Sequence, residues 1–415
     1  MPRKKRRVVV TGLGPITSIG LGKSALWHSL EKGLKNFSKV TKFDVDALNL
    51  DTTIVSEIKD FNPIDFVTKK EADRMDTFTQ YAVASTLMAF EDAHLSMKHV
   101  QADRFAVIIG TAIGGIESLY DAVATYEKYG YKKVSSTVIP RVLPGLVASQ
   151  IAMILNARGP NKVISTTCTS STHAIGEAFR LIRNGEADLA VAGGAEACIS
   201  PWPFIGFCKV GAMTTRKDDK ASRPFDKHRD GFVMSEGAGA LILEELRSAE
   251  KRGANIYAEI VGYGASADAF HVTAPLPDGS MSARAIKNAL DDAQIEYDAV
   301  DYINAHGTST KYNDMFETKA IKNVFGRRAY KIPVSSTKSM LGHAQGACGA
   351  IETIATILTI VNKKIHPTMN HEEQDPDCDL DYVFNKARDK KVNIAVKNSL
   401  GFGGNNAAIV IKNIS

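Results

Sequence analysis

The sequence predicts a layered α/β protein made of two related halves. Short apolar, β-branched segments alternate with helical patterns along its 415 residues, which is typical of helices packed on sheets. The alternation begins again after about residue 254, so we expect one half over 1–254 and a second over 255–415. With 44% hydrophobic residues the chain is able to bury a large core.

The elements of the first half follow from the period of their apolar residues. Alternating or continuous apolar runs predict strands over 7–12, 105–110, 162–164, 189–193 and 238–243. A helical period predicts helices over 76–93 and 171–183. Further strands are expected over 300–303 and 393–398 in the second half.

The duplication is clearest in two pairs of segments and two pairs of residues. The segment 256–264 echoes 7–14, and Ala289-Leu-Asp-Asp-Ala echoes Ala89-Phe-Glu-Asp-Ala. Glu177 follows Cys168 by nine residues, and Glu352 follows His343 by the same interval. If the halves pack about a pseudo-twofold axis, Cys168 and His343 meet in one pocket.

Cys168 is predicted to be a nucleophile. It lies between a short apolar strand and a helix, where the positive end of the helix dipole is expected to lower its thiol pKa. The other four cysteines, at 198, 208, 348 and 378, are expected to be inert and buried. The five cysteines contain no CxxC pair, so we expect free thiols and neither a redox pair nor a zinc knuckle.

Two histidines and a glycine-rich turn complete the predicted site. His306 follows the strand over 300–303, with Gly307 allowing a sharp turn. His343 lies where the second half repeats the position of Cys168. The turn Gly401-Phe-Gly-Gly follows a strand, and its backbone N–H groups could form an oxyanion site.

Composition limits the other functions. The net charge of +5 is modest, and the basic run over 1–7 has no further basic run beside it, so we expect a solvated lead-in rather than nucleic-acid binding. The longest apolar helical stretch, 350–361, is too short to span a bilayer, and no apolar signal segment opens the chain. We therefore expect a soluble, cytoplasmic protein.

The chain resembles the elongating β-ketoacyl-acyl carrier protein synthases of type II fatty-acid synthesis. The motifs that carry the resemblance are Thr167-Cys-Thr-Ser-Ser, Asn304-Ala-His-Gly-Thr-Ser-Thr, Lys338-Ser-Met-Leu-Gly-His and Gly401-Phe-Gly-Gly. The resemblance covers essentially the whole chain. It implies a thiolase-like fold of two βαβαβαββ halves in a five-layered αβαβα arrangement, a homodimer, and fatty-acid elongation with acyl carrier protein as partner.

The resemblance also implies roles for the residues. Cys168 would carry the acyl chain, and His306 and His343 would stabilise the enolate formed when a malonyl thioester loses carbon dioxide. Lys338 and Glu352 would position the histidines. Phe402 would be a gate, and its N–H would complete the oxyanion hole. No metal and no cofactor are implied beyond the phosphopantetheine of the carrier.

Substrate and carrier contacts are likewise implied. Thr308 and Thr310 would contact the pantetheine arm, Ile113 would lie at the acyl pocket, and Gly403 would belong to the substrate-binding turn. At some positions where the family often has a basic residue that contacts the carrier, this chain has a different residue. The docking patch is therefore expected at Lys69, Lys70, Arg74 and Lys209.

Other classes of protein with the same fold differ from this chain at single residues of the active site. A thiolase would use a second cysteine as base, and an initiating synthase would have asparagine in place of His343. A non-catalytic chain-length factor would lack Cys168. A type II polyketide or specialised-lipid ketosynthase would share these motifs and stays the alternative. Preferred acyl length and the particular carrier are not specified by the sequence.

Overall fold

Two sets of five strands form the framework of the computed structural model, which describes residues 5–414. Those of the first half are β1 (Val8–Thr17), β5 (Phe105–Gly110), β6 (Asn161–Ile164), β7 (Leu189–Glu196) and β9 (Gly237–Glu245). Those of the second are β10 (Ala258–Ala267), β11 (Tyr302–Asn304), β12 (Val334–Ser335), β15 (Ile394–Gly401) and β16 (Asn405–Lys412). The predicted strands are thus present, with ends shifted by a few residues.

The two sets have the same strand order. It runs β6-β5-β7-β9-β1 in the first and β12-β11-β15-β16-β10 in the second. β1 and β10 pair antiparallel over three residues, from Val8 opposite Ile260 to Val10 opposite Ala258, and join the sets into one continuous sheet. Equivalent strands therefore occupy equivalent places, as a duplicated chain predicts.

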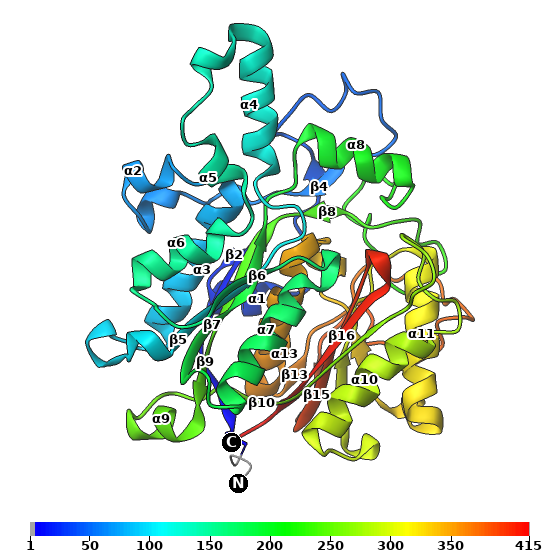
Figure 1. The fold of residues 1–415 in the computed structure, drawn as a ribbon. Coiled ribbons are helices and arrows are strands. Elements are labelled where there is room, and N and C mark those ends of the chain that lie inside the picture. Colours follow the sequence, from blue (N-terminus) through cyan, green and yellow to red (C-terminus); the bar gives the residue numbers. More distant parts are fainter. Residues whose placement is uncertain (1–4, 415) are drawn as a thin grey trace.

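Helices fill the layers between and outside the strands (Figure 1). α7 (Ser170–Arg183) and α13 (Cys348–Asn362) lie in the middle. α3 (Thr77–Asp92) and α6 (Leu146–Leu155) cover the outer face of the first set, and α10 (Ser280–Ala293) and α11 (Lys311–Phe325) cover that of the second. The arrangement is αβαβα, which confirms the predicted fold class.

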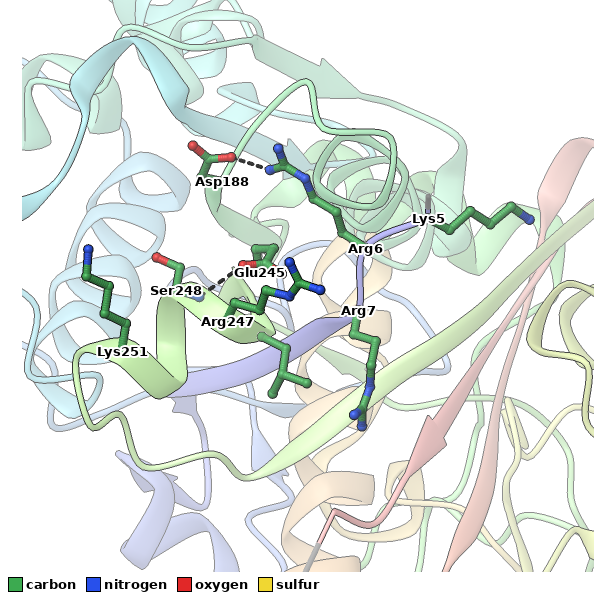
Figure 2. A pocket seen from close by; sticks show the side chains of 9 residues that line it. Lys5, Arg6, Arg7, Asp188, Glu245, Arg247, Ser248 and Lys251 are labelled. Atoms are coloured by element: carbon green, nitrogen blue, oxygen red, sulfur yellow. Dashed lines mark hydrogen bonds and ion pairs between the residues drawn. The ribbon is translucent and has the colours of Figure 1, made fainter. Parts of the chain in front are cut away.

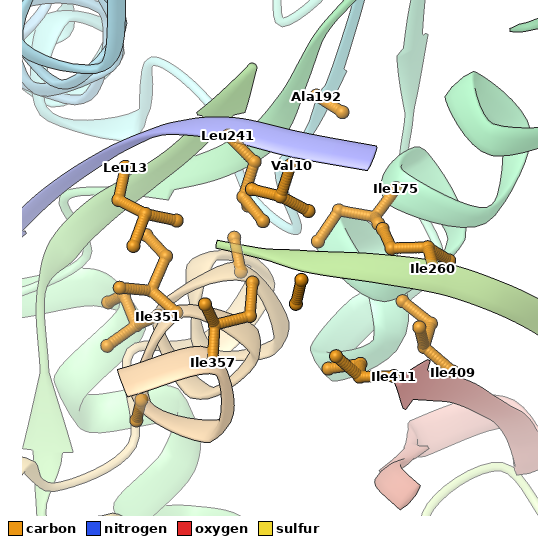
Figure 3. Close-up of a cluster of buried hydrophobic side chains, with 14 of the residues drawn as sticks. Val10, Leu13, Ile175, Ala192, Leu241, Ile260, Ile351, Ile357, Ile409 and Ile411 are labelled. Atoms are coloured by element: carbon orange, nitrogen blue, oxygen red, sulfur yellow. The ribbon is translucent and has the colours of Figure 1, made fainter. Parts of the chain in front are cut away.

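The main core lies in the middle layer. Figure 3 shows Ile175 of α7 and Ile351 and Ile357 of α13 among side chains from both sets of strands. Val10 and Leu241 come from the first set, while others such as Ile260, Ile409 and Ile411 come from the second. Burial of this apolar surface holds the halves together.

Two glycines at equivalent positions of the two halves have the same contact with an outer helix. A Cβ at Gly12 would meet the carbonyl oxygen of Ala89 at 2.1 Å, and a Cβ at Gly262 would meet that of Ala289 at 2.1 Å. Both strands therefore need glycine where the outer helix presses against them. The repeated Ala89 and Ala289 segments face equivalent strands.

Smaller elements surround this framework. The remaining strands are β2 (Gly20–Leu21), β3 (Ser38–Lys39), β4 (Ile54–Ser56), β8 (Met234–Ser235), β13 (Lys364–Ile365) and β14 (Arg388–Asp389). The remaining helices are α1 (Lys23–Lys32), α2 (Lys69–Ala72), α4 (Ile116–Tyr129), α5 (Val138–Val142), α8 (Pro201–Val210), α9 (Leu246–Lys251) and α12 (Lys338–Leu341). Within residues 5–414 no helix has both the length and the apolar character that crossing a membrane requires.

Candidate active site

A cavity of about 360 Å³ lies where the two halves meet, and it collects the predicted reacting groups. Cys168 reaches it from the first half, and His306 and His343 reach it from the second. The wall also contains Phe207, Phe232, Thr308, Thr310, Gln345 and Phe402. Residues that are far apart in the sequence therefore line one site.

Cys168 sits on a strained turn at the start of α7. The preceding Thr167 has a φ of 55°, an unusual value for a β-branched residue. The Ser170 side chain closes the turn, because its Oγ accepts from the Thr166 N–H at 2.9 Å and donates to the Thr167 carbonyl at 2.6 Å. This turn aims the thiol into the cavity.

The resting thiol of Cys168 holds its proton. Burial raises its pKa far above the ordinary value, and nearby Lys338 and the Phe402 N–H oppose this only in part. The expected lowering of the pKa by the helix dipole is therefore wrong, because desolvation of a thiolate outweighs it. The proton needs an acceptor when the thiol attacks.

His343 provides an acceptor. Its Nε2 lies 3.1 Å from the Cys168 Sγ, and its backbone N–H donates to the Val233 carbonyl at 2.8 Å. Among the residues described, no group bonds its buried Nδ1. Burial, with nearby Lys338 and Lys397, lowers the pKa of the ring well below its usual value, so the imidazole is neutral.

His306 faces His343 across the cavity. Their ring centroids lie 5.4 Å apart, with the planes at 85°. The turn that carries His306 is fixed by Glu317, whose carboxylate accepts from the N–H groups of His306 and Gly307, each at 2.7 Å. Gly307 has a φ of 40°, which glycine permits.

The proton of the His306 ring is directed to Nε2. The Lys338 ammonium lies 3.3 Å from Nδ1 and donates to the His306 carbonyl at 2.6 Å. Because an ammonium has only donors, Nδ1 acts as an acceptor and Nε2 keeps the proton. Burial and then Lys338 lower the pKa of His306 well below the usual value.

Lys338 and Glu352 form a buried ion pair. The Lys338 Nζ bonds Glu352 Oε1, and both side chains are almost fully buried. Burial opposes the ammonium charge, but Glu352 and the acidic groups near it raise the Lys338 pKa overall. A second ammonium, Lys397, approaches the other oxygen of Glu352 at 2.6 Å.

Phe402 contributes both its backbone and its ring. Its N–H points to the Cys168 sulfur and favours the thiolate. The Phe402 carbonyl accepts from the Thr167 Oγ1 at 2.9 Å, which fastens the turn to the nucleophile. The ring lies 6.3 Å from that of Phe207.

The predicted substrate residues divide into two groups. Thr308 and Thr310 line the cavity, and their hydroxyl oxygens are 2.9 Å apart. Gly403 and Ile113 are not among the lining residues. The Gly403 N–H donates to the Val272 carbonyl at 2.6 Å, and Ile113 packs on the apolar cluster that contains Phe204 and Phe232.

The predicted docking residues are exposed but do not gather in one place. Lys69 and Lys70 lie on α2 and Arg74 follows it, whereas Lys209 lies in the last turn of α8. The two helices stand on either side of α4 (Figure 1). Lys209 adjoins Val210, which lines the cavity.

Two sets of side chains have the donor types of a metal site. Cys168, His306 and His343 offer ligand atoms that lie within 4.8 Å of one another. His306 also forms such a set with Cys348 and Glu352. Thiolate and imidazole suit zinc, but Cys168 and His343 already bond each other and Glu352 is already paired with ammonium groups.

A second cavity, of about 600 Å³, lies away from Cys168 and the two histidines, beside the start of β1. Figure 2 shows that charged side chains line it, among them Arg6, which pairs with Asp188. None of its lining residues is a histidine or cysteine. Of the basic run over 1–7, residues 1–4 lie outside the described part of the chain.

Several residues of the site were missed by sequence reasoning. They are Glu196, Glu317, Gln345 and Lys397. Glu196 accepts from the N–H groups of Ala112, Ile113, Gly114 and Gly346, and Gln345 lies 3.5 Å from the thiol. Glu196 and Lys397 could have been found in the sequence, because each is a charged residue within an otherwise apolar strand.

Comparison with known families gives the class of the protein. Residues 5–249 match Beta-ketoacyl synthase, N-terminal domain, and residues 257–372 match Beta-ketoacyl synthase, C-terminal domain. The chain belongs to the beta-ketoacyl synthase family of condensing acyltransferases.

Its relatives narrow the class. The chain is 47% identical over 411 residues to 3-oxoacyl-[acyl-carrier-protein] synthase 2 of Synechocystis sp., covering 99% of this chain and 98% of that protein. It is 46% identical over 410 residues to the protein of the same name from Staphylococcus aureus, covering 99% of each. These matches confirm the resemblance to the elongating synthases.

Solved structures agree in fold. A type II PKS ketosynthase, in complex with its acyl-carrier protein and bound to the hexaketide, has a TM-score of 0.93 and 35% identity, covering 99% of this chain and 100% of that chain. The ishigamide ketosynthase/chain length factor has a TM-score of 0.93 and 37% identity, with the same coverage.

The protonation of His306 is a testable consequence of the site. We expect nitrogen-detected NMR of the resting protein at pH 6 to show a neutral ring protonated at Nε2, because its pKa is lowered by burial and Lys338 donates to Nδ1. The His306→Asn variant assigns the signal. An imidazolium signal at pH 6 would contradict the assignment, since an unperturbed histidine titrates at about 6.5.

Proposed function

We propose that this protein joins an acyl thioester to malonyl-acyl carrier protein, giving 3-oxoacyl-acyl carrier protein and carbon dioxide in fatty-acid elongation. The observation that carries the proposal is the meeting of one thiol with two neutral imidazoles in one cavity, with Cys168 Sγ 3.1 Å from His343 Nε2. The relatives named 3-oxoacyl-[acyl-carrier-protein] synthase 2 support the same reaction.

The first half-reaction loads Cys168. Its sulfur attacks the carbonyl carbon of the acyl thioester while the S–H proton passes to His343 Nε2. The N–H groups of Cys168 and Phe402 bind the oxyanion of the tetrahedral intermediate. The carrier thiol leaves with that proton, and the acyl group stays on Cys168 as a thioester.

The second half-reaction makes and uses a carbanion. The bond between the malonyl α-carbon and its carboxylate breaks, and the electron pair passes into an enolate whose oxygen accepts from His306 Nε2 and His343 Nε2. The unbonded Nδ1 of His343 lets that ring change tautomer between the two steps. The α-carbon attacks the acyl carbonyl, and the Cys168 sulfur leaves as a thiolate that takes the proton of His343 Nε2, while His343 regains a proton from solvent at Nδ1.

Neutral imidazoles suit this task. They donate hydrogen bonds to the enolate without attracting the malonyl carboxylate into a salt bridge that would have to break. Lys338 and Glu352 keep His306 in the required tautomer and place. Loss of carbon dioxide supplies the carbanion, so no base strong enough to remove a C–H proton is needed.

The remaining predicted residues have supporting roles in this proposal. Thr308 and Thr310 would contact the pantetheine arm, since both hydroxyls border the cavity. Phe402 would move when Cys168 is acylated and open a path toward the cluster where Ile113 packs. Gly403, with a φ of 80°, gives the turn the conformation that such a movement needs.

Acyl carrier protein is the proposed partner. Lys209 stands beside the cavity and would meet an acidic carrier surface, while Lys69, Lys70 and Arg74 would add positive charge from α2. The substrates arrive on the carrier's phosphopantetheine, so the reaction uses no other cofactor. We place the protein in the cytoplasm, where fatty-acid elongation on free carriers would occur.

A ketosynthase of a type II polyketide pathway is the second candidate. The fold of this chain matches the solved structures of such enzymes with TM-scores of 0.93. Identity favours fatty-acid elongation, at 46–47% to the 3-oxoacyl synthases against 35–37% to the polyketide proteins. The elongation assignment is therefore preferred.

A homodimer is also proposed. β6 is the outermost strand of the first set, so one of its edges pairs with no other strand within residues 5–414. Large exposed apolar side chains lie on α4 and α6, including Tyr126, Tyr129 and Met153. A second copy would cover this surface and the edge together.

Turnover with purified carriers tests the proposed reaction. We expect the wild-type protein to take up an acyl group from acyl carrier protein and, once malonyl carrier protein is added, to release 3-oxoacyl carrier protein. The Cys168→Ala variant should take up no acyl group, because the nucleophile is gone. Intact-mass spectrometry of protein and carriers follows both events, and an acyl group on the Cys168→Ala variant would contradict the assigned nucleophile.

Mass in solution tests the dimer. Light scattering coupled to gel filtration should give twice the mass of the 44.9 kDa chain. The Tyr126→Glu and Met153→Glu changes, on exposed apolar positions, should favour the monomer because they place charge in the interface. A wild-type monomer at micromolar concentration would overturn the proposal.

A further inference from the structure

Lys397 is a second buried cation next to the histidine network. It lies on β15, its side chain is 0% exposed, and its Nζ is 2.6 Å from Glu352 Oε2. The same Nζ also donates to the Asn398 carbonyl at 2.7 Å and to Ser399 Oγ, so three oxygen atoms surround this ammonium group.

One carboxylate thus faces two ammonium groups. Lys338 bonds Glu352 Oε1 and Lys397 approaches Oε2, and all three side chains are almost fully buried. Removing a charge from water is costly unless it is paired. Glu352 already has a partner in Lys338, so the second lysine is not needed to neutralise it.

The contacts of Lys397 link the two sides of the reaction. Ser399, which accepts from Lys397, lies 2.7 Å from Thr172 through their hydroxyl oxygens. Thr172 is in the first turn of α7, four residues after Cys168. On the other side, Glu352 leads through Lys338 to His306.

We propose that Lys397 is a positioning residue for the condensation: it holds the Glu352 carboxylate between two cations and thereby keeps Lys338 against His306. The proposal rests on the reaction proposed above. Lys397 touches no substrate, and its effect is expected on the malonyl half-reaction, in which His306 takes part.

The charges around the two imidazoles support this role. They are Lys338 of α12, Lys397 of β15, Glu352 of α13 and Glu317 of α11, with the thiols of Cys168 and Cys348 beside them. Lys397 is among the groups that lower the pKa of both His306 and His343. A second cation therefore keeps the rings neutral and favours an enolate anion between them.

The test compares Lys397→Met with Lys364→Met. Lys364 pairs with Glu31 outside the site, so its loss removes a lysine without changing the cavity. We expect Lys397→Met to load acyl groups at a rate within about twofold of wild type, but to decarboxylate malonyl carrier protein about tenfold more slowly, because misplaced groups lower rates steeply. Lys364→Met should match the wild type in both.

The pH profile separates positioning from a merely structural role. Removing the Lys397 charge relieves the repulsion that lowers the histidine pKa values, so the rings protonate at higher pH. The acid limb of the decarboxylation rate should move to higher pH in Lys397→Met and stay in place in Lys397→Arg, which keeps the charge. A folded Lys397→Met variant with the wild-type rate and acid limb would overturn the proposal.

Failure of this inference is distinguishable from failure of the proposed reaction. NMR of the resting Lys397→Met protein reports the His306 titration without any substrate. If that titration moves upward while the wild-type enzyme proves inactive, the reaction is wrong and the positioning role stands. Should Lys397→Met not fold, Lys397→Gln is measured in its place, and an unmoved titration in it overturns the role.

Discussion

The close crossing of α7 and α13 is the constraint on which the site depends. A Cβ at Gly349 would meet the Thr172 Oγ1 at 2.1 Å, so the helices approach as closely as glycine allows. The Ala350 N–H donates to Ser171 Oγ at 2.9 Å and fixes their relative position. Because the turns before these helices carry Cys168 and His343, this crossing brings the thiol and the imidazole together.

Burial then sets the chemistry of the groups that meet there. It favours the neutral thiol of Cys168 and the neutral rings of His306 and His343. Neutral donors around this cavity stabilise a charge that appears only during reaction, which is where electrostatic catalysis is strongest. The charged pair of Lys338 and Glu352 stays behind the histidines, where it orients them.

Much of this could be predicted from the sequence because the chain is duplicated. The equal spacing from Cys168 to Glu177 and from His343 to Glu352 indicated equivalent turns, and the structure has both at the starts of the central helices. The motif around Lys338 identified its network through resemblance to a known family.

Other features depend on three-dimensional context that spacing does not contain. The pKa of Cys168 was misjudged because the helix dipole is visible in the sequence pattern but the depth of burial is not. Lys397 and Glu196 stand in apolar strands, and only the fold reveals which carboxylate or amides they face. The four docking residues lie on α2, after it and on α8, which sequence alone could not place on separate sides of α4.

The two halves divide the work of the reaction between them, and decarboxylation without condensation separates their contributions. Malonyl carrier protein is given alone to the Cys168→Ala and His306→Ala variants, and release of carbon dioxide is measured. We expect release by Cys168→Ala, which keeps both imidazoles, and a loss of about 10²–10³-fold in His306→Ala, which lacks one enolate donor. Equal loss in both variants would show that Cys168 is needed to form the carbanion, and the assigned roles would be wrong.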